Sequence, residues 1–309
     1  MPPRRRAAAP VGAVLGILAV GVAAVASVVW YLDSRDPAAT REWCAATLDG
    51  RDHPLSPVQA GNAALIVGQT VQRGLPARAA TIGLATAMQE SRLVNIDYGD
   101  RDSIGLFQQR PSQGWGTVEE IMDPVYSTDA FYDGLVEVDG WQDMEVTDAA
   151  QEVQRSAFPE AYAQHEQMAR AWASSLTGHS PGSVTCELPG VGADGPSGAS
   201  AVTTLTDLLE RDLGVPTGSV DEVDDPQGDG RVALAIDATA LPVDEVERAT
   251  WTVAHWAVAT ADTTGAVEVR AADQVWSRGT GAWTLVDEGE PQPEGRVTVV
   301  VGPQPASLY

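Results

Sequence analysis

Apolar residues recur at helical spacing in the first half of the chain. Ser56, Pro57 and Gln59 predict a helix start, because Ser caps the first turn, Pro is tolerated at its first position and Gln completes a capping box. The apolar positions that follow keep one helical face until Gly74. Further helices are predicted from Pro76 to about Ser91, from starts at Thr117, Asp123 and Thr147, and over 159–176.

The pattern changes in the second half. Residues 178–201 are rich in Gly, Pro and Ser, which predicts a linker. Beyond them, Val232, Leu234 and Ile236 alternate with other residues, as on a strand with one buried face. Helices are predicted over 204–213 and 242–263, and strands over 231–237, 267–269, 275–277, 283–285 and 296–301. We therefore expect a mainly α domain over 33–177, the linker, and a small C-terminal α+β sandwich domain over 202–309.

A long uncharged, apolar run lies near the N-terminus. It spans 7–32 and predicts a single-pass transmembrane helix over 11–32, because about 20 apolar residues cross a bilayer. The Arg-rich tail 1–10 precedes it, so this tail is expected in the cytoplasm and the remainder outside the cytoplasm. A cleaved signal peptide with Ala24-Val25-Ala26 as its cleavage site is the alternative. The apolar run continues past that site to Trp30, which favours the anchor.

Charge and cysteine content restrict the function further. The net charge is −24, from 43 acidic and 19 basic residues, and all the basic ones are Arg. Such acidity opposes nucleic-acid binding, which depends on neutralising phosphates. Cys44 and Cys186 are an isolated pair in a chain expected to be exported, so we predict a disulfide. The histidines show no metal-ligand spacing; His255, beside Trp251 and Trp256, is expected to pack, and neither a metal nor a cofactor is predicted.

The sequence around Glu90 has the strongest catalytic pattern. Glu90 ends a predicted helix of apolar and small residues, so its carboxyl group should be half shielded by the core. Burial raises a carboxyl pKa, and a protonated carboxyl is what glycosidic bond cleavage needs. An Asp-rich loop over 95–105 and the glycine-led segment Gly105–Gln109 follow. A lone Glu at a helix end is more often a solvated surface residue, so the pattern needs support from its neighbours.

That support is a resemblance to known enzymes. Gln89-Glu90-Ser91 and Gly105-Leu106-Phe107-Gln108 resemble the Glu-Ser and Gly-Leu-Met-Gln motifs of soluble lytic transglycosylases and goose-type lysozymes, with Phe in the usual Met position. Tyr98-Gly99-Asp100-Arg101 is similar to the Trp-Gly-Asp-Arg stretch of goose-type lysozymes. The motif stretch also resembles actinobacterial exported proteins. The similarity covers roughly 56–176 and implies a lysozyme-like fold with Glu90 on the floor of a sugar-binding cleft. It also implies that Gly105, Leu106, Phe107 and Gln108 form the facing wall, and Ser91 and Gln109 next to these motifs are further candidates for substrate binding.

A second carboxylate would decide the reaction. An inverting hydrolase needs one to activate water, whereas in a lytic transglycosylase the muramoyl 6-hydroxyl attacks. The resemblance makes Asp100 the candidate, and Asp97 and Asp102 lie close to it in the sequence. Loop Asp residues also form turns and cap amides, and that interpretation stays equally open. A calcium site from these three is disfavoured, because the spacing lacks the distal Glu of an EF-hand loop.

Two aromatic residues complete the prediction. Trp115, between glycines, could stack on a sugar or cover the core. The family's later Tyr-Asn motif is absent, and Tyr162 is the nearest tyrosine. We predict a membrane-anchored, extracytoplasmic muramidase that cleaves peptidoglycan glycan strands between N-acetylmuramic acid and N-acetylglucosamine. The alternatives are a noncatalytic peptidoglycan-binding module and a cell-envelope assembly protein that binds a partner through its C-terminal domain.

Overall fold

The capping box at Ser56 forms as the sequence predicts. In the computed structural model, the Ser56 side chain accepts from the Gln59 backbone N–H, and the Gln59 side chain accepts from the Ser56 N–H. The helix α2 (Pro57–Gln72) begins there. The structure describes residues 42–156, 158–192, 195–224, 230–286 and 291–303. The predicted anchor over 11–32 lies outside these residues, and no helix within them is long and apolar enough to span a bilayer.

The region that follows is helical, as expected. A second capping box joins Thr117 and Glu120, and Asp123 caps the helix after it. Two predictions were imprecise: Thr147 lies inside a helix that begins at Val146, and the single helix expected over 159–176 is divided into a 3-10 segment and an α-helix. These elements are α3 (Ala77–Ser91), α4 (Val118–Met122), α5 (Pro124–Val136), α6 (Val146–Gln154), η2 (Pro159–His165) and α7 (Glu166–Leu176).

A small sheet that the sequence patterns did not reveal lies beside these helices. It has the order β2-β1-β3 and consists of β1 (Trp43–Leu48), β2 (Arg51–Leu55) and β3 (Val184–Glu187). The strand β3 lies in the range expected as a linker, and Cys186 pairs with Cys44 across the β1–β3 ladder. These two cysteines form the expected disulfide. The bridge joins segments 142 residues apart, so it constrains the unfolded chain strongly.

The C-terminal region contains a six-stranded antiparallel sheet. Its order is β4-β5-β9-β6-β7-β8, and β9 pairs with both β5 and β6. Alternate residues of β9, such as Val297 and Val299, are fully buried, as expected for a strand with one face on the core. The strands are β4 (Val220–Val223), β5 (Val232–Asp237), β6 (Ala266–Ala271), β7 (Gln274–Ser277), β8 (Ala282–Leu285) and β9 (Arg296–Val301). The sequence did not predict β4.

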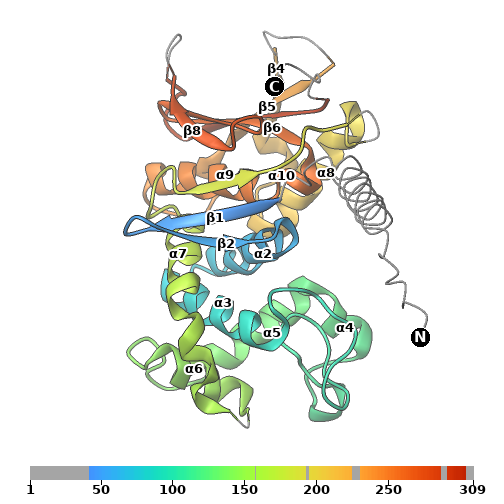
Figure 1. Cartoon of the computed structure of the whole chain (residues 1–309), viewed down its shortest axis with the longest axis vertical. Helices are drawn as coiled ribbons and strands as arrows, with labels where there is room; N and C mark the ends of the chain where they lie inside the picture. The colour runs from blue at the N-terminus through green and yellow to red at the C-terminus, as the bar shows by residue number, and fades with distance from the viewer. Residues whose placement is uncertain (1–41, 157, 193–194, 225–229, 287–290, 304–309) are drawn as a thin grey trace, which may run out of the picture. The chain divides into compact units, whose positions relative to one another are not determined.

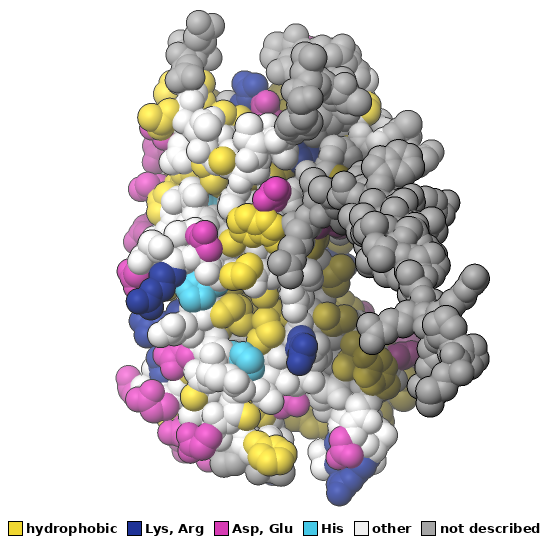
Figure 2. All heavy atoms as spheres, viewed as in Figure 1, with side chains coloured by type: hydrophobic (Ala, Val, Ile, Leu, Met, Phe, Trp, Pro, Cys, Tyr) yellow, Lys and Arg dark blue, Asp and Glu magenta, His cyan; other side chains and the backbone are white. Residues whose placement is uncertain are grey.

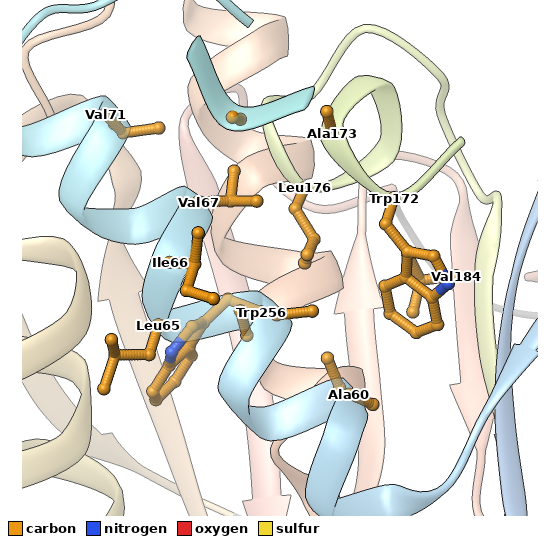
Figure 3. Packing of buried hydrophobic residues seen from close by; sticks show 14 of the residues in the cluster. Ala60, Leu65, Ile66, Val67, Val71, Trp172, Ala173, Leu176, Val184 and Trp256 are labelled. Atoms are coloured by element: carbon orange, nitrogen blue, oxygen red, sulfur yellow. The ribbon is translucent and has the colours of Figure 1, made fainter. Parts of the chain in front are cut away.

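Three helices lie beside this sheet, and the first two also pack on the helical region. They are α8 (Gly198–Leu213), α9 (Val246–Ala259) and α10 (Ala261–Thr264). The helix α9 packs on β6 and β9 and also on α2 and α7, while α8 packs on α2 (Figure 1). Buried residues of both regions therefore belong to one hydrophobic cluster, which includes Val67, Leu176 and Trp256 (Figure 3). The residues 42–309 group as one compact unit.

The surface carries the acidic charge of the composition. On the face drawn in Figure 2, Asp and Glu side chains lie mainly along the left edge and the lower left, while Arg side chains appear in a few places. Several Arg residues are held in ion pairs, for example Arg73 with Asp129 and Asp133. This distribution fits the charge-based argument against binding a polyanion.

Candidate active site

Glu90 lies in the last turn of α3, where the chain reverses. Arg92 and Leu93 both take left-handed backbone conformations, with φ of 57°. The buried hydroxyl of Ser91 donates to Leu106 O at 2.7 Å, and so attaches the end of α3 to the glycine-led segment. The motifs around Glu90 and Gly105 therefore lie next to each other in space.

The carboxyl group of Glu90 is half-buried and held by a phenol. The Tyr162 hydroxyl donates to Glu90 Oε1 at 2.7 Å, and the amide of Gln154 also favours the charged form of the carboxyl. Burial raises the pKa of Glu90 above its ordinary value, because desolvation outweighs the opposing effect of these hydrogen bonds. A carboxyl group in this environment keeps its proton to a higher pH than a solvated one, as a general acid requires.

Tyr162 provides the phenol that contacts the acid. Its ring is buried, and it comes from the 3-10 segment η2. Its pKa is raised, because the hydroxyl is desolvated and lies against a carboxylate. Its hydroxyl donates to Glu90 Oε1, so Tyr162 contacts this carboxyl directly.

The glycine-led turn has a conformation that requires glycine. Gly105 has φ of 80° and donates to Ile96 O at 2.7 Å, and a Cβ there would lie 2.8 Å from Ile121 O. Phe107 is fully buried and stacks on Phe131 with ring centroids 4.6 Å apart. The turn is consequently fixed between the core and the end of α3.

The expected wall residues divide into two groups. Leu106, Phe107 and Gln109 are buried, and the Gln109 amide donates to Ser127 O at 2.9 Å. Their side chains support the turn, so a ligand would meet their backbone groups. Gln108 is half-buried, and its amide donates to Tyr98 O and Gly105 O, both at 3.3 Å.

The Asp-rich loop separates its carboxylates into different environments. The side chain of Asp100 is 91 % exposed, with Arg101 Nε at 3.9 Å. Asp102 accepts from Arg110 Nε and from the Ser112 backbone N–H, both at 2.8 Å, which holds its pKa well below the usual range. Asp102 thus stabilises the loop, and Asp100 is free to meet a ligand. No group of three or more His, Cys, Asp or Glu side chains in the described part of the chain is arranged to hold a metal ion.

A cavity of about 980 Å³ is lined in part by residues of α5 and α6. Trp115 and Gln154 are among its lining residues, whereas Glu90 is not. Gln154 is thus a residue of the cavity wall that also affects the pKa of Glu90. The remaining lining residues are Gln113, Gly134, Glu137, Val138, Asp139, Met144, Glu152, Val153 and Arg155.

Sequence reasoning missed the role of Gln154. Its amide Nε2 donates to Phe107 O at 2.8 Å, and its side chain favours the charged form of the Glu90 carboxyl. The residue lies where the family's Tyr-Asn motif was sought, so a search for any amide in this segment could have selected it. His165 was not predicted either. Its Nε2 lies 3.0 Å from Oε1 of Gln89, the residue that precedes Glu90.

Comparison with known proteins adds no further identification. No protein-family model matches this chain, and none of the curated proteins matches it.

The raised pKa of Glu90 has a consequence for stability. A carboxyl whose pKa is higher in the folded state stabilises the fold below its unfolded pKa of about 4.3, and this contribution is lost as the pH rises through the folded pKa. Glu90→Gln removes the ionisation, so we expect this variant to be more stable than wild type at pH 8, by about 0.5–2 kcal/mol. At pH 4 the difference should largely vanish.

Urea denaturation at the two pH values checks this expectation. Glu210→Gln is the matched control, because Glu210 is exposed on α8 and its substitution should change stability little at either pH. A Glu90→Gln variant that is less stable than wild type at pH 8 would contradict the assigned environment of the acid.

Proposed function

We propose that this chain is an extracytoplasmic muramidase that cleaves the glycan strands of peptidoglycan, with Glu90 as the general acid. The observation that carries the proposal is the half-buried Glu90 carboxyl, which accepts from Tyr162 and whose neighbour Ser91 bonds to Leu106 O in the Gly105 turn. The order of motifs shared with soluble lytic transglycosylases and goose-type lysozymes supports a lysozyme-like assignment for the helical region. The disulfide supports a location outside the cytoplasm.

The mechanism follows from the protonation of Glu90. Its proton passes to the glycosidic oxygen as the bond to the muramoyl C1 breaks, so the leaving sugar departs as an alcohol. Tyr162 and Gln154 then stabilise the carboxylate that remains, because both can donate to it. In a transglycosylase that carboxylate next accepts the proton of the muramoyl 6-hydroxyl that attacks C1. In an inverting hydrolase a second carboxylate, with Asp100 as the candidate, takes the proton of the water that attacks C1.

Product analysis tests the proposal and separates its two forms. Purified sacculi are digested and the muropeptides analysed by mass spectrometry; anhydro ends identify a transglycosylase and reducing ends a hydrolase. If Asp100 activates water, we expect Asp100→Asn to lower the yield of reducing ends about 100-fold, within the range for a general base. If the products are anhydro, the same variant should leave their yield almost unchanged.

A noncatalytic peptidoglycan-binding role is the second candidate. It is favoured by the position of Glu90 outside the lining of the 980 Å³ cavity and by the absence of the Tyr-Asn motif. Sedimentation of the protein with sacculi, without released muropeptides, would support this role. The C-terminal sheet is the surface we propose for a cell-envelope partner, and the apolar run over 11–32 is the segment we propose as the membrane anchor.

A further inference from the structure

A second cavity, of about 260 Å³, has a charge opposite to that of the whole chain. Its lining contains Arg78, Arg170 and one acidic residue, Glu166, whereas acidic residues outnumber basic ones by 43 to 19 in the sequence. The 980 Å³ cavity follows the composition instead, with three acidic side chains and one Arg in its lining. An anion that most of this surface repels would therefore meet net positive charge in the smaller cavity.

Arg78 is a cation whose charge and donors are little used by the protein. The residue is half-buried near the start of α3, and none of the ion pairs among the described residues includes it. Its Nη2 donates to Met144 O, while its Nε is buried with no hydrogen-bond partner in the described part of the chain. A guanidinium has five N–H donors, and a partly desolvated cation without a counter-ion is unfavourable. An anion bound against Arg78 would reduce this cost.

The other cation, Arg170, is only loosely paired. Its Nη1 lies 3.5 Å from Glu166 Oε1 one turn earlier on α7, and its side chain is 65 % exposed. An exposed pair of this kind contributes little free energy, so the guanidinium can turn toward a ligand at small cost. Two arginines and one glutamate leave one net positive charge in the lining, which matches a monoanion better than a dianion.

The start of α3 and two apolar side chains complete the cavity. Ala77 and Arg78 are the first two residues of α3, which has no side-chain cap and no acidic residue in its first turn. The first N–H groups of a helix lack intrahelical acceptors and carry partial positive charge, which adds to that of the arginines. Ala77 and Val146 offer apolar surface to the carbon atoms next to an anionic group. The lining thus suits a carboxylate, which is a monoanion carried on carbon.

We propose that this cavity binds a carboxylate, held between the guanidinium groups of Arg78 and Arg170. Arginine can bind a carboxylate through two parallel N–H···O bonds, which are stronger than hydrogen bonds between neutral groups. The carboxylate belongs either to a free small acid or to the C-terminal end of a peptide. Neither Glu90 nor Tyr162 is among the lining residues, so this site is separate from the proposed active site.

Binding of acetate to the full chain, followed by NMR, tests this site. His179 lines the cavity, so the signals of its imidazole ring report on a ligand there. We expect acetate to shift these signals to saturation, and acetamide, which has nearly the same shape but no charge, to leave them unchanged. Inorganic phosphate at pH 8, where it is mainly a dianion, should bind no more tightly than acetate, because the lining holds one net positive charge.

A blocked dipeptide separates the two sources of the carboxylate. N-acetyl-alanyl-alanine with a free C-terminal carboxylate is compared with its C-terminal amide and with acetate. Tighter binding of the free dipeptide than of acetate would assign the site to the end of a peptide, and equal binding would assign it to a free small acid. The amide should not bind in either case.

Two substitutions of opposite sign test the lining. Arg78→Gln removes a guanidinium and should weaken acetate binding about 10-fold, the effect of losing charge-assisted hydrogen bonds. Glu166→Gln removes the carboxylate that competes for Arg170 and should tighten acetate binding about threefold. Arg101→Gln is the control, because Arg101 is 71 % exposed and outside the lining, and it should leave the affinity unchanged.

Arg170→Gln keeps the test decisive if Arg78→Gln does not fold, because Arg170 is exposed and its substitution should weaken acetate binding without disturbing the core. The inference is overturned by equal binding of acetate and acetamide, by tighter binding of phosphate, or by an acetate affinity that is the same in Arg170→Gln, Glu166→Gln and wild type. None of these measurements depends on muropeptide release, so the carboxylate site and the muramidase proposal can fail independently.

Discussion

Glu90→Gln is expected to lower the rate of muropeptide release by about 10²- to 10⁴-fold, the range for loss of a general acid. Glutamine has nearly the same shape as glutamate and retains an oxygen that accepts from the Tyr162 hydroxyl, so the surrounding hydrogen bonds change little. It carries no proton that can pass to the glycosidic oxygen. Mass spectrometry of soluble muropeptides over time measures the effect.

The control for this substitution is Glu210→Gln. It makes the same chemical change on the exposed face of α8, far along the chain from the site, and should leave the rate within twofold of wild type. The Glu90→Gln variant should also keep the binding of wild-type protein to sacculi, because the turn and the cavity remain. Equal turnover in Glu90→Gln and wild type would rule out Glu90 as the acid.

Deletion of residues 202–309 is expected to abolish cooperative folding of the helical region. A Cβ at Gly68 on α2 would lie 2.1 Å from Asp212 O on α8, so these two helices approach as closely as backbone atoms allow. The amides of Gln69 and Gln72 both donate to Arg211 O at 3.0 Å. Without α8 and α9, one side of α2 would be exposed to water, along with its share of the common cluster (Figure 3).

A single substitution at the same interface should lower the stability of the fold without abolishing folding. Trp256 is buried, and its indole N–H donates at 2.9 Å to the carboxylate of the fully buried Asp212. We expect Trp256→Ala to lower the free energy of unfolding by about 3–5 kcal/mol, through a cavity and an unsatisfied buried acceptor. Near-UV circular dichroism and urea denaturation measure the effect of the deletion of 202–309 and of Trp256→Ala. A truncated chain that unfolds cooperatively with a native spectrum would instead establish an autonomous helical domain.

This interface also connects the two regions at a buried histidine. His255 on α9 contacts Ser175 O through Nδ1 at 2.7 Å and accepts from the Ser183 N–H through Nε2 at 3.1 Å. Burial lowers the pKa of His255 to about 4, so it is neutral at physiological pH and can satisfy both groups. The prediction that His255 packs, made from its aromatic neighbours on the helix, agrees with its burial and its contacts with Trp251 and Trp283.

Local sequence determined most of the helices and several strands. Capping residues act within one turn, so Ser56, Thr117 and Asp123 marked helix starts without information from the rest of the chain. The alternating residues of β5 likewise predicted a strand. The pairing of Cys44 with Cys186 followed from there being only two cysteines.

Other features depended on contacts between distant segments. The strands β1 and β3 pair across more than 130 residues, and β3 lies in a Gly- and Pro-rich range whose composition predicts a linker. A strand stabilised by its neighbours in a sheet need not show a pattern of its own. The composition of 178–201 therefore gave no sign of β3, nor of the interface that brings α8 onto α2.

The sequence by itself singled out Glu90 and the Gly105 turn as candidates, because their residue types and order are local and resemble a known pattern. Only the tertiary structure decided what surrounds the Glu90 carboxyl. Tyr162 lies 72 positions further along the chain, and it reaches Glu90 because η2 packs against α3. Burial, which raises the pKa of that carboxyl, is a property of packed elements and cannot be read from one segment.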